Sequence, residues 1–338
     1  MIWPGDLDAD LSRFGEPRDG SLGVGGLPSA VAAGLSLSPS GFPLFASDTG
    51  GYRDSPPSKE TFTRWFEHAA LMPVMQIGTG SSTVAWEFEG TDFDDEMLGW
   101  YRDYTRLHLR LFPMFWTAIQ GFADGGRPIV RPLGLAYPEL GTHPSDVYML
   151  GDDLLVAPIV DPGVTERTVT LPPGEWIRWF DGNAQQGEVT VDAPLGKLPL
   201  WLRVGGIVPM LRPTIDTLSP TGQPDRVDSF ANDAGKLWPR IALGPASELV
   251  LYDGTTMTQQ GGMDEATIIW TDGEVFTQGA VIEVVGFVAA PQELTLDGAS
   301  LAMAADVSAL GESPGWVHTG TTLWIGVGAG EHTVVVSR

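Results

Sequence analysis

Apolar residues recur along the chain at two different spacings, and the change comes near residue 127. In residues 58–71 they recur every three or four positions, which predicts a helix with Ser58 as its capping residue. A second helical stretch is predicted over residues 94–122. We expect an interruption at Pro113, because proline removes a backbone donor and clashes with the preceding turn.

Short apolar runs indicate strands in the rest of the chain. Residues 41–47 form an almost wholly apolar run, as expected of a parallel strand buried on both faces. After residue 127, short runs separated by glycine, proline and aspartate turns are typical of antiparallel sandwiches. These runs are 129–135, 154–159, 167–171, 176–180 and 206–210, then 248–252, 266–270, 281–288, 293–296, 321–327 and 331–336. Residues 213–235, rich in proline, aspartate and serine, predict a linker or long loop.

Composition limits the classes of partner and chemistry. A formal net charge of −24 argues against binding to nucleic acids or anionic membrane surfaces. The chain has no cysteine, which excludes disulfides, thiolate metal sites and cysteine nucleophiles. No run of 18 apolar residues predicts a membrane span, and the N-terminus lacks the pattern of a signal peptide. None of this identifies the compartment, and a neutral sugar substrate is compatible with it.

The most informative segment is GFPLFASDTGGY, residues 41–52. Its apolar run leads directly into Asp48 and then into the glycine pair Gly50 and Gly51. Barrel enzymes deliver polar groups to substrate from the C-terminal ends of their strands. A carboxylate there accepts charge-assisted hydrogen bonds, and glycines allow a tight turn and close approach of the backbone. The alternative is an ordinary turn aspartate that caps the following loop.

Ordered segments over residues 3–210 resemble glycoside hydrolase family 31, which comprises retaining α-glucosidases, α-xylosidases and their relatives. Residues 213–338 show no resemblance that we can name. The resembling segments are WPGD (3–6), 41–52, LHLRLFP (107–113), 126–133, 148–158, LPPGEW (171–176) and 198–209.

The resemblance implies an α/β region followed by all-β domains. We expect the C-terminal portion of a (β/α)8 TIM barrel in residues 1–135. A proximal antiparallel β-sandwich would occupy 136–213, and a linker with a distal sandwich 214–338. A complete barrel takes about 250 residues, so roughly half of one is present. The missing N-terminal half of the barrel is therefore an expected partner.

The resemblance also assigns the acid/base. It implies that Asp6 protonates the leaving oxygen and later deprotonates the attacking water. Trp3 would help to provide the apolar setting that raises the pKa of such a carboxyl. The alternative is a turn or cap aspartate. A calcium loop formed with Asp8 and Asp10 is disfavoured, because Leu11 stands where that loop needs glycine.

The remaining substrate contacts include one departure from the family pattern. Relatives read Pro-x-x-Arg-x-His in the strand where this chain has Pro73-Val-Met-Gln-Ile-Gly78. Gln76 therefore replaces a substrate-binding arginine, and Gly78 replaces a histidine. Asp48 would bind sugar hydroxyls, while Trp86 would wall the subsite or simply pack in the interior.

The sequence thus predicts a retaining α-glycoside hydrolase with an oligosaccharide or α-glycoside substrate, no cofactor and no metal. The 338 residues contain no Trp-x-Asp-Met-Asn-Glu string, where the family carries its nucleophile. We therefore expect this polypeptide alone to be inactive. The alternative is a non-catalytic carbohydrate-binding or structural module with a remnant barrel.

Overall fold

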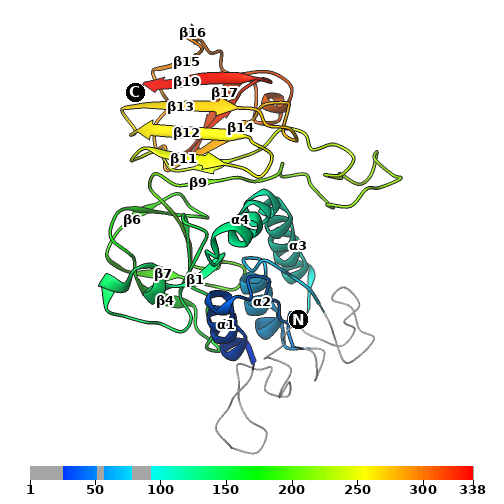
Figure 1. Cartoon of the computed structure of the whole chain (residues 1–338), viewed down its shortest axis with the longest axis vertical. Coiled ribbons are helices and arrows are strands. Elements are labelled where there is room, and N and C mark those ends of the chain that lie inside the picture. The colour runs from blue at the N-terminus through cyan, green and yellow to red at the C-terminus, as the bar shows by residue number, and fades with distance from the viewer. Residues whose placement is uncertain (1–25, 52–56, 78–92, 338) are drawn as a thin grey trace, which may run out of the picture. The chain divides into compact units, whose positions relative to one another are not determined.

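The computed structural model describes residues 26–51, 57–77 and 93–337, which form two compact units (Figure 1). The first unit takes the described residues up to His108, together with Gly121–Pro172 and Gly187–Leu200. The second takes Leu109–Gln120, Pro173–Gln186 and the described residues from Trp201 onward. No helix in these ranges is long and apolar enough to cross a membrane.

Helices dominate the early part of the described chain. They are α1 (Gly26–Leu37), α2 (Lys59–Ala69), α3 (Asp95–Arg110) and α4 (Phe112–Gly125), with the short α5 (Leu133–Ala136) later. The Ser58 hydroxyl accepts a 3.2 Å hydrogen bond from the Thr61 amide, so the predicted cap of α2 is confirmed. The predicted interruption is confirmed too, since Pro113 lies in the first turn of α4, where its missing amide costs nothing.

The strands of the first unit form two small antiparallel ladders. One contains β1 (Val130–Pro132), β2 (Tyr148–Leu150) and β3 (Leu154–Val156), and the other pairs β4 (Glu166–Thr170) with β7 (Glu188–Asp192). The predicted strand at 129–135 is shorter than expected, because α5 begins at Leu133.

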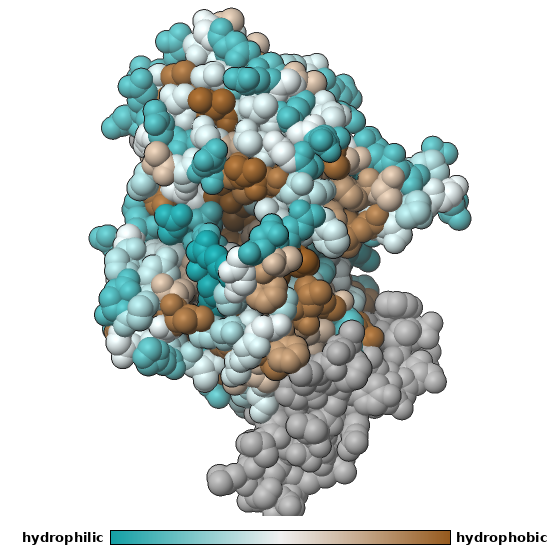
Figure 2. Space-filling model, viewed as in Figure 1, coloured by the Kyte–Doolittle hydropathy of each residue, from teal (hydrophilic) through white to brown (hydrophobic). Residues whose placement is uncertain are grey.

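The prediction of a strand buried on both faces over residues 41–47 is wrong for its first half. Phe42 and Leu44 are 54% and 51% exposed, and the segment carries no strand pairing before Asp48. Only Phe45 to Asp48 are buried, where the segment packs against α1 and α2. Figure 2 shows one face of the molecule, on which hydrophobic patches alternate with polar side chains.

Two sheets enclose the core of the second unit. The first sheet has the order β17-β18-β14-β10-β9, and the second has the order β11-β12-β13-β19-β15-β16. All pairings are antiparallel except that of β10 with β14. Their bounds are β9 Ile207–Val208, β10 Arg240–Ile241, β11 Ser247–Val250, β12 Thr256–Gly261, β13 Glu265–Thr271, β14 Val281–Val285, β15 Glu293–Leu296, β16 Ala299–Ser300, β17 Gly315–Thr319, β18 Thr322–Gly326 and β19 Glu331–Ser337.

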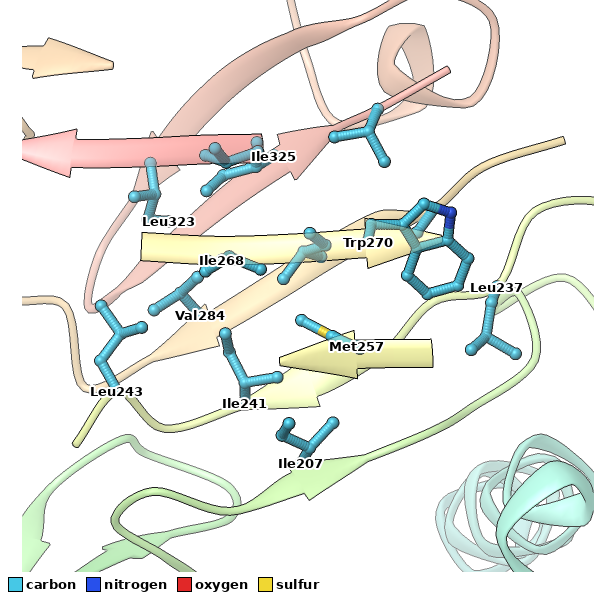
Figure 3. Packing of buried hydrophobic residues seen from close by; sticks show 14 of the residues in the cluster. Ile207, Leu237, Ile241, Leu243, Met257, Ile268, Trp270, Val284, Leu323 and Ile325 are labelled. Carbon is cyan, nitrogen blue, oxygen red and sulfur yellow. The ribbon is translucent and has the colours of Figure 1, made fainter. Parts of the chain in front are cut away.

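The core between these sheets is built from alternate residues of each strand. In β13, Ala266, Ile268 and Trp270 are buried while their neighbours are more exposed, as expected of a strand with one face inward. Figure 3 shows Ile268 and Trp270 in the same cluster as Val284 and Ile325 from the other sheet. A further antiparallel ladder joins β5 (Trp176–Arg178) to β6 (Ala184–Gln185) and β8 (Leu200–Arg203).

Candidate functional site

Asp48 and Gln76 lie side by side in the first unit. They form a parallel bridge, and the Gln76 amide nitrogen Nε2 donates a 2.8 Å hydrogen bond to Oδ1 of Asp48. The Asp48 side chain is buried, with 4% of its surface exposed. No donor among the described residues contacts its Oδ2. This leaves one carboxylate oxygen without a protein donor within that part of the chain.

Hydrogen bonds to the backbone carbonyl of Gln76 fix the position of this pair. The Thr49 amide and hydroxyl both donate to the Gln76 carbonyl oxygen, at 3.0 and 2.7 Å. Two segments 28 residues apart are therefore joined at the point where their polar side chains begin. The carboxylate and the amide cannot separate unless these bonds break.

The chain turns sharply after Asp48, and the turn requires glycine. Gly50 and Gly51 have φ angles of 85° and 86°, in the left-handed region, and the Gly51 amide donates to the Asp48 carbonyl at 2.9 Å. A Cβ atom on Gly50 would lie 2.9 Å from both Phe62 and Pro57. Gly50 is thus required both for its backbone angle and for the close approach of α2.

Two aromatic contacts position the segment that leads to Asp48. The Trp65 indole nitrogen donates a 2.9 Å hydrogen bond to the Ser47 hydroxyl, and Trp65 itself is fully buried. On the other side, a Cβ on Gly34 of α1 would lie 2.9 Å from the Phe45 ring. The absence of a side chain at Gly34 lets α1 pack directly on this ring. Asp48 is therefore presented from rigid support.

A buried ion pair anchors α2, the helix that carries Trp65. Arg64 donates to Oε2 of Glu67 at 3.1 Å, and both side chains are almost fully buried. The Arg64 guanidinium also donates to the carbonyls of Val164 and Ala193, and the Gly196 amide donates to Glu67. Burial raises the pKa of Glu67 to about 7, although Arg64 and the Gly196 amide pull it down.

His68 lies one residue further along the helix and is buried as a neutral imidazole. Its Nδ1 lies 3.1 Å from the Tyr148 hydroxyl, and its Nε2 has no hydrogen-bond partner among the described residues. Burial lowers the pKa of His68 to about 3 and raises that of Tyr148 above its ordinary range. A protonated His68 would be an unpaired buried charge, so this imidazole supports the helix and does not transfer protons at neutral pH.

The structure brings together two of the five predicted site residues, Asp48 and Gln76. Asp6, Trp3 and Trp86 lie outside the described residues. Sequence reasoning missed Thr49 and the Trp65–Ser47 contact. Thr49 follows Asp48 directly, so its place at the end of the predicted strand was the available signal. No group of acidic or histidine side chains in the described part of the chain has the arrangement of a metal site.

Two family models match the chain, each over a different part of it. Residues 24–118 match the glycosyl hydrolases family 31 TIM-barrel domain, and residues 126–208 match the family 31 C-terminal domain. The chain belongs to glycoside hydrolase family 31. Its members among the similar proteins are glycosidases and transferases.

Individual relatives extend the match. An isomaltosyltransferase of Sporosarcina globispora is 28% identical over the whole chain, which spans 31% of that protein. The similarity thus includes residues 213–338, where the sequence alone suggested none. A sulfoquinovosidase of Escherichia coli is 36% identical over 60% of the chain and 29% of its own length. The cycloalternan-forming enzyme of Listeria monocytogenes, solved with a pentasaccharide substrate, has a TM-score of 0.76 at 25% identity. It is matched over 92% of this chain and 31% of its own.

Proposed function

We propose that this chain supplies a sugar-binding carboxylate, Asp48, and the acid/base of a retaining family 31 enzyme that acts on α-glycosides. The observation that carries the proposal is the Asp48–Gln76 pair: a buried carboxylate, held by a neutral amide, with one oxygen left for a hydroxyl. The pentasaccharide complex of the Listeria enzyme supports a carbohydrate ligand. In this proposal residues 1–135 form the end of the barrel, 136–213 the proximal sandwich, and 214–338 the linker with the distal sandwich.

Asp48 would hold the sugar at the point of cleavage. A carboxylate only accepts hydrogen bonds, and a sugar hydroxyl that donates to it gains a charge-assisted bond. Gln76 already satisfies Oδ1. Oδ2 is therefore the oxygen that we assign to the substrate.

Gln76 would set the charge of the subsite. An arginine in this place would pair with Asp48 and neutralise it, whereas the amide of Gln76 leaves the negative charge in place. The subsite would then favour a neutral sugar with a hydroxyl donor over one that carries an anionic group. Trp86 would line the same subsite.

Asp6, with Trp3 beside it, would act as acid and base in turn. A carboxylate nucleophile forms a bond to the anomeric carbon while Asp6 gives its proton to the leaving oxygen. Asp6 then takes a proton from water, or from a sugar hydroxyl in a transferase, as that oxygen displaces the nucleophile. The nucleophile string does not occur in these 338 residues. It would come from the missing half of the barrel.

The rival function is a non-catalytic carbohydrate-binding or structural module. Both functions allow sugar binding, but only the enzyme needs Asp6. The chain spans about 31% of the first relative's length, so activity is tested on two polypeptides. One is the 338-residue chain, and the other also carries the upstream half of the barrel.

The test is a screen on aryl α-glucoside, α-xyloside and α-galactoside. We expect no turnover by the 338-residue chain and turnover by the longer polypeptide, abolished by Asp6→Asn. Asp48→Asn serves as the companion variant and should mainly raise KM. Turnover by the short chain, or an unaffected Asp6→Asn enzyme, would refute the assignment.

A further inference from the structure

A cavity in the second unit lies apart from Asp48 in the chain and has the lining of a ligand site. Its volume is about 470 Å³, within the range of about 300–1,000 Å³ that small-molecule sites occupy. Its wall contains two tryptophans, Trp238 and Trp324, whose rings meet edge to face with centroids 6.2 Å apart. Both rings pack on a small apolar cluster below and are partly exposed above it.

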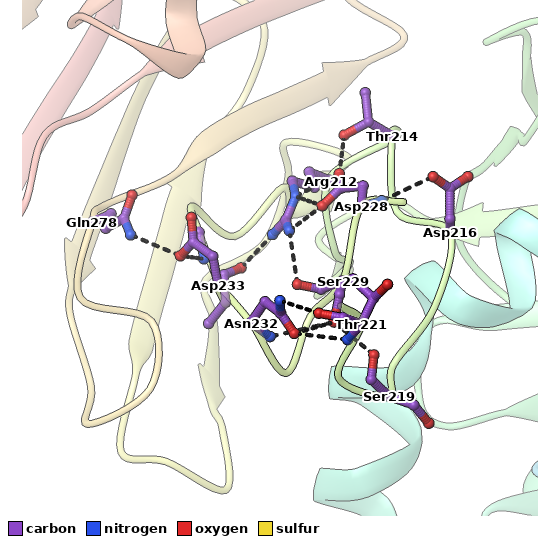
Figure 4. Close-up of polar contacts among 12 residues, drawn as sticks. Arg212, Thr214, Asp216, Ser219, Thr221, Asp228, Ser229, Asn232, Asp233 and Gln278 are labelled. Atoms are coloured by element: carbon purple, nitrogen blue, oxygen red, sulfur yellow. Dashed lines mark hydrogen bonds and ion pairs between the residues drawn. The ribbon is translucent and has the colours of Figure 1, made fainter. Parts of the chain in front are cut away.

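Polar groups complete the wall and keep free hydrogen-bonding capacity. The Gln278 amide nitrogen donates to Oδ1 of Asp233 at 3.1 Å, and both side chains are exposed (Figure 4). No described residue donates to the second oxygen of Asp233 or accepts from the indole nitrogen of Trp238. Donors and acceptors thus stand beside two aromatic rings.

The cavity wall holds two cations, Arg212 and Lys236, and one carboxylate, Asp233, while Asp228 outside the wall neutralises Arg212. Arg212 forms an ion pair with Asp228, as Figure 4 shows, and it also donates to the Ala234 carbonyl. Lys236 donates to the carbonyls of Leu310 and Val327, and Asp233 supplies a negative charge in the same wall. A cavity without a surplus of either sign favours a neutral ligand over a phosphate or a cation.

The same contacts hold the cavity in shape without a ligand. Arg212 closes the long loop after residue 212 back onto Ala234, and a Cβ on Gly235 would lie 2.8 Å from its guanidinium. Lys236 ties this segment to the turn at Leu310 and to Val327 after β18. A site that is already formed loses little conformational entropy on binding.

We propose that this cavity is a second, non-catalytic site for a neutral oligosaccharide. A pyranose ring has an apolar C–H face and a polar rim, which match the tryptophan rings and the Asp233–Gln278 pair. The inference goes beyond the proposed function, because binding here needs neither Asp6 nor Asp48. Such a site would hold a polymeric substrate to the protein while its end is processed elsewhere.

The test is calorimetric titration of the 338-residue chain with isomaltotriose and maltotriose. It is done in an Asp48→Ala background, so that the catalytic subsite does not contribute. We expect saturable binding by concentrations of about 10 mM, with a Kd of about 1 mM or lower. Gln278→Ala should weaken binding about threefold to tenfold, the effect of one neutral hydrogen bond. Trp324→Ala should weaken it about tenfold.

Gln292→Ala is the matched control, an exposed glutamine of the same unit outside the cavity wall, and should not change binding. Because Trp324 also packs on the apolar cluster, its variant is first checked by thermal unfolding, and Gln278→Ala decides if it fails to fold. If neither trisaccharide binds, the proposal is overturned. It is also overturned by binding that Gln278→Ala leaves unchanged, which would place the sugar elsewhere. Failure here leaves the proposed function intact, since that is tested by turnover.

Discussion

The indole nitrogen of Trp65 lies 2.9 Å from the hydroxyl oxygen of Ser47, the residue immediately before Asp48. This bond joins α2 to the end of the segment that presents the carboxylate. The position of Asp48 therefore depends on a helix that makes no contact with substrate in the proposed function.

Trp65→Phe should lower the free energy of unfolding by about 1–3 kcal/mol, because it leaves the buried Ser47 hydroxyl without a partner. Adding Ser47→Ala should recover part of that loss, since both polar groups are then gone. Urea unfolding of both single variants and the double variant gives the coupling energy. If the losses of unfolding free energy in the two single variants are strictly additive, the Trp65–Ser47 hydrogen bond does not contribute to stability.

Gly50→Ala should destabilise the first unit more than Gly41→Ala. Both glycines have positive φ angles, 85° and 94°, so each substitution carries a backbone cost of about 1 kcal/mol. Only at Gly50 does the new methyl group also meet Phe62 and Pro57, which adds about 1–3 kcal/mol; nothing lies within 4 Å at Gly41. Thermal unfolding of the two variants measures the difference. Equal losses would show that the close approach to α2 does not matter.

Glu67 and His68 should give the stability of the protein opposite dependences on pH. Burial raises the pKa of Glu67 from 4.5 to about 7, so the folded chain keeps a proton that the unfolded chain releases, and stability falls as pH rises through this window. Burial lowers the pKa of His68 from 6.5 to about 3, so the unfolded chain takes up a proton that the folded chain does not, and stability falls as pH falls below 6.5. Between pH 4.5 and 6.5 the two effects oppose each other.

Single variants should separate these effects. In Glu67→Gln the free energy of unfolding should rise with pH between 4.5 and 6.5 more steeply than in the parent, by about 1.4 kcal/mol per pH unit. In His68→Phe the slope should change by a similar amount in the other direction. Urea unfolding at three pH values measures both slopes. The assignment fails if neither variant changes the slope.

Asp6→Ala in a polypeptide that carries the complete barrel should reduce turnover of unactivated glycosides by about 10²–10⁴-fold. Substrates with good leaving groups should retain more activity, because they need no protonation in the first step. Azide, which attacks without base assistance, should restore part of the rate on those substrates. Near-normal turnover of unactivated glycosides by Asp6→Ala would exclude Asp6 as the acid/base.

Local features of the fold were predictable because they depend on neighbouring residues. The cap at Ser58, the interruption near Pro113 and most strands of the second unit follow from spacing and turn residues. The helix α1 was missed, although its alanine-rich sequence favours a helix. The strand over residues 41–47 was overestimated, because an apolar run does not specify what covers Phe42 and Leu44.

The candidate site was predictable only in part, for a related reason. The sequence identified Asp48 and Gln76 as candidate substrate-binding residues. Their contact, however, depends on a backbone bridge between segments 28 residues apart. The ion pair that anchors α2 uses carbonyl groups of Val164 and Ala193, which have no sequence signature. The aromatic cavity of the second unit likewise joins residues from five separate segments.

The bond between Arg64 and the Ala193 carbonyl has a consequence for synthesis of the protein. Arg64 leaves the ribosome 129 residues before its acceptor, a delay of about 6 to 26 seconds at typical elongation rates. Until then the Arg64 guanidinium lacks this hydrogen-bond acceptor, and the surface on which α2 docks is incomplete. The segment that presents Asp48 therefore becomes rigid only after the residues around Ala193 have been translated.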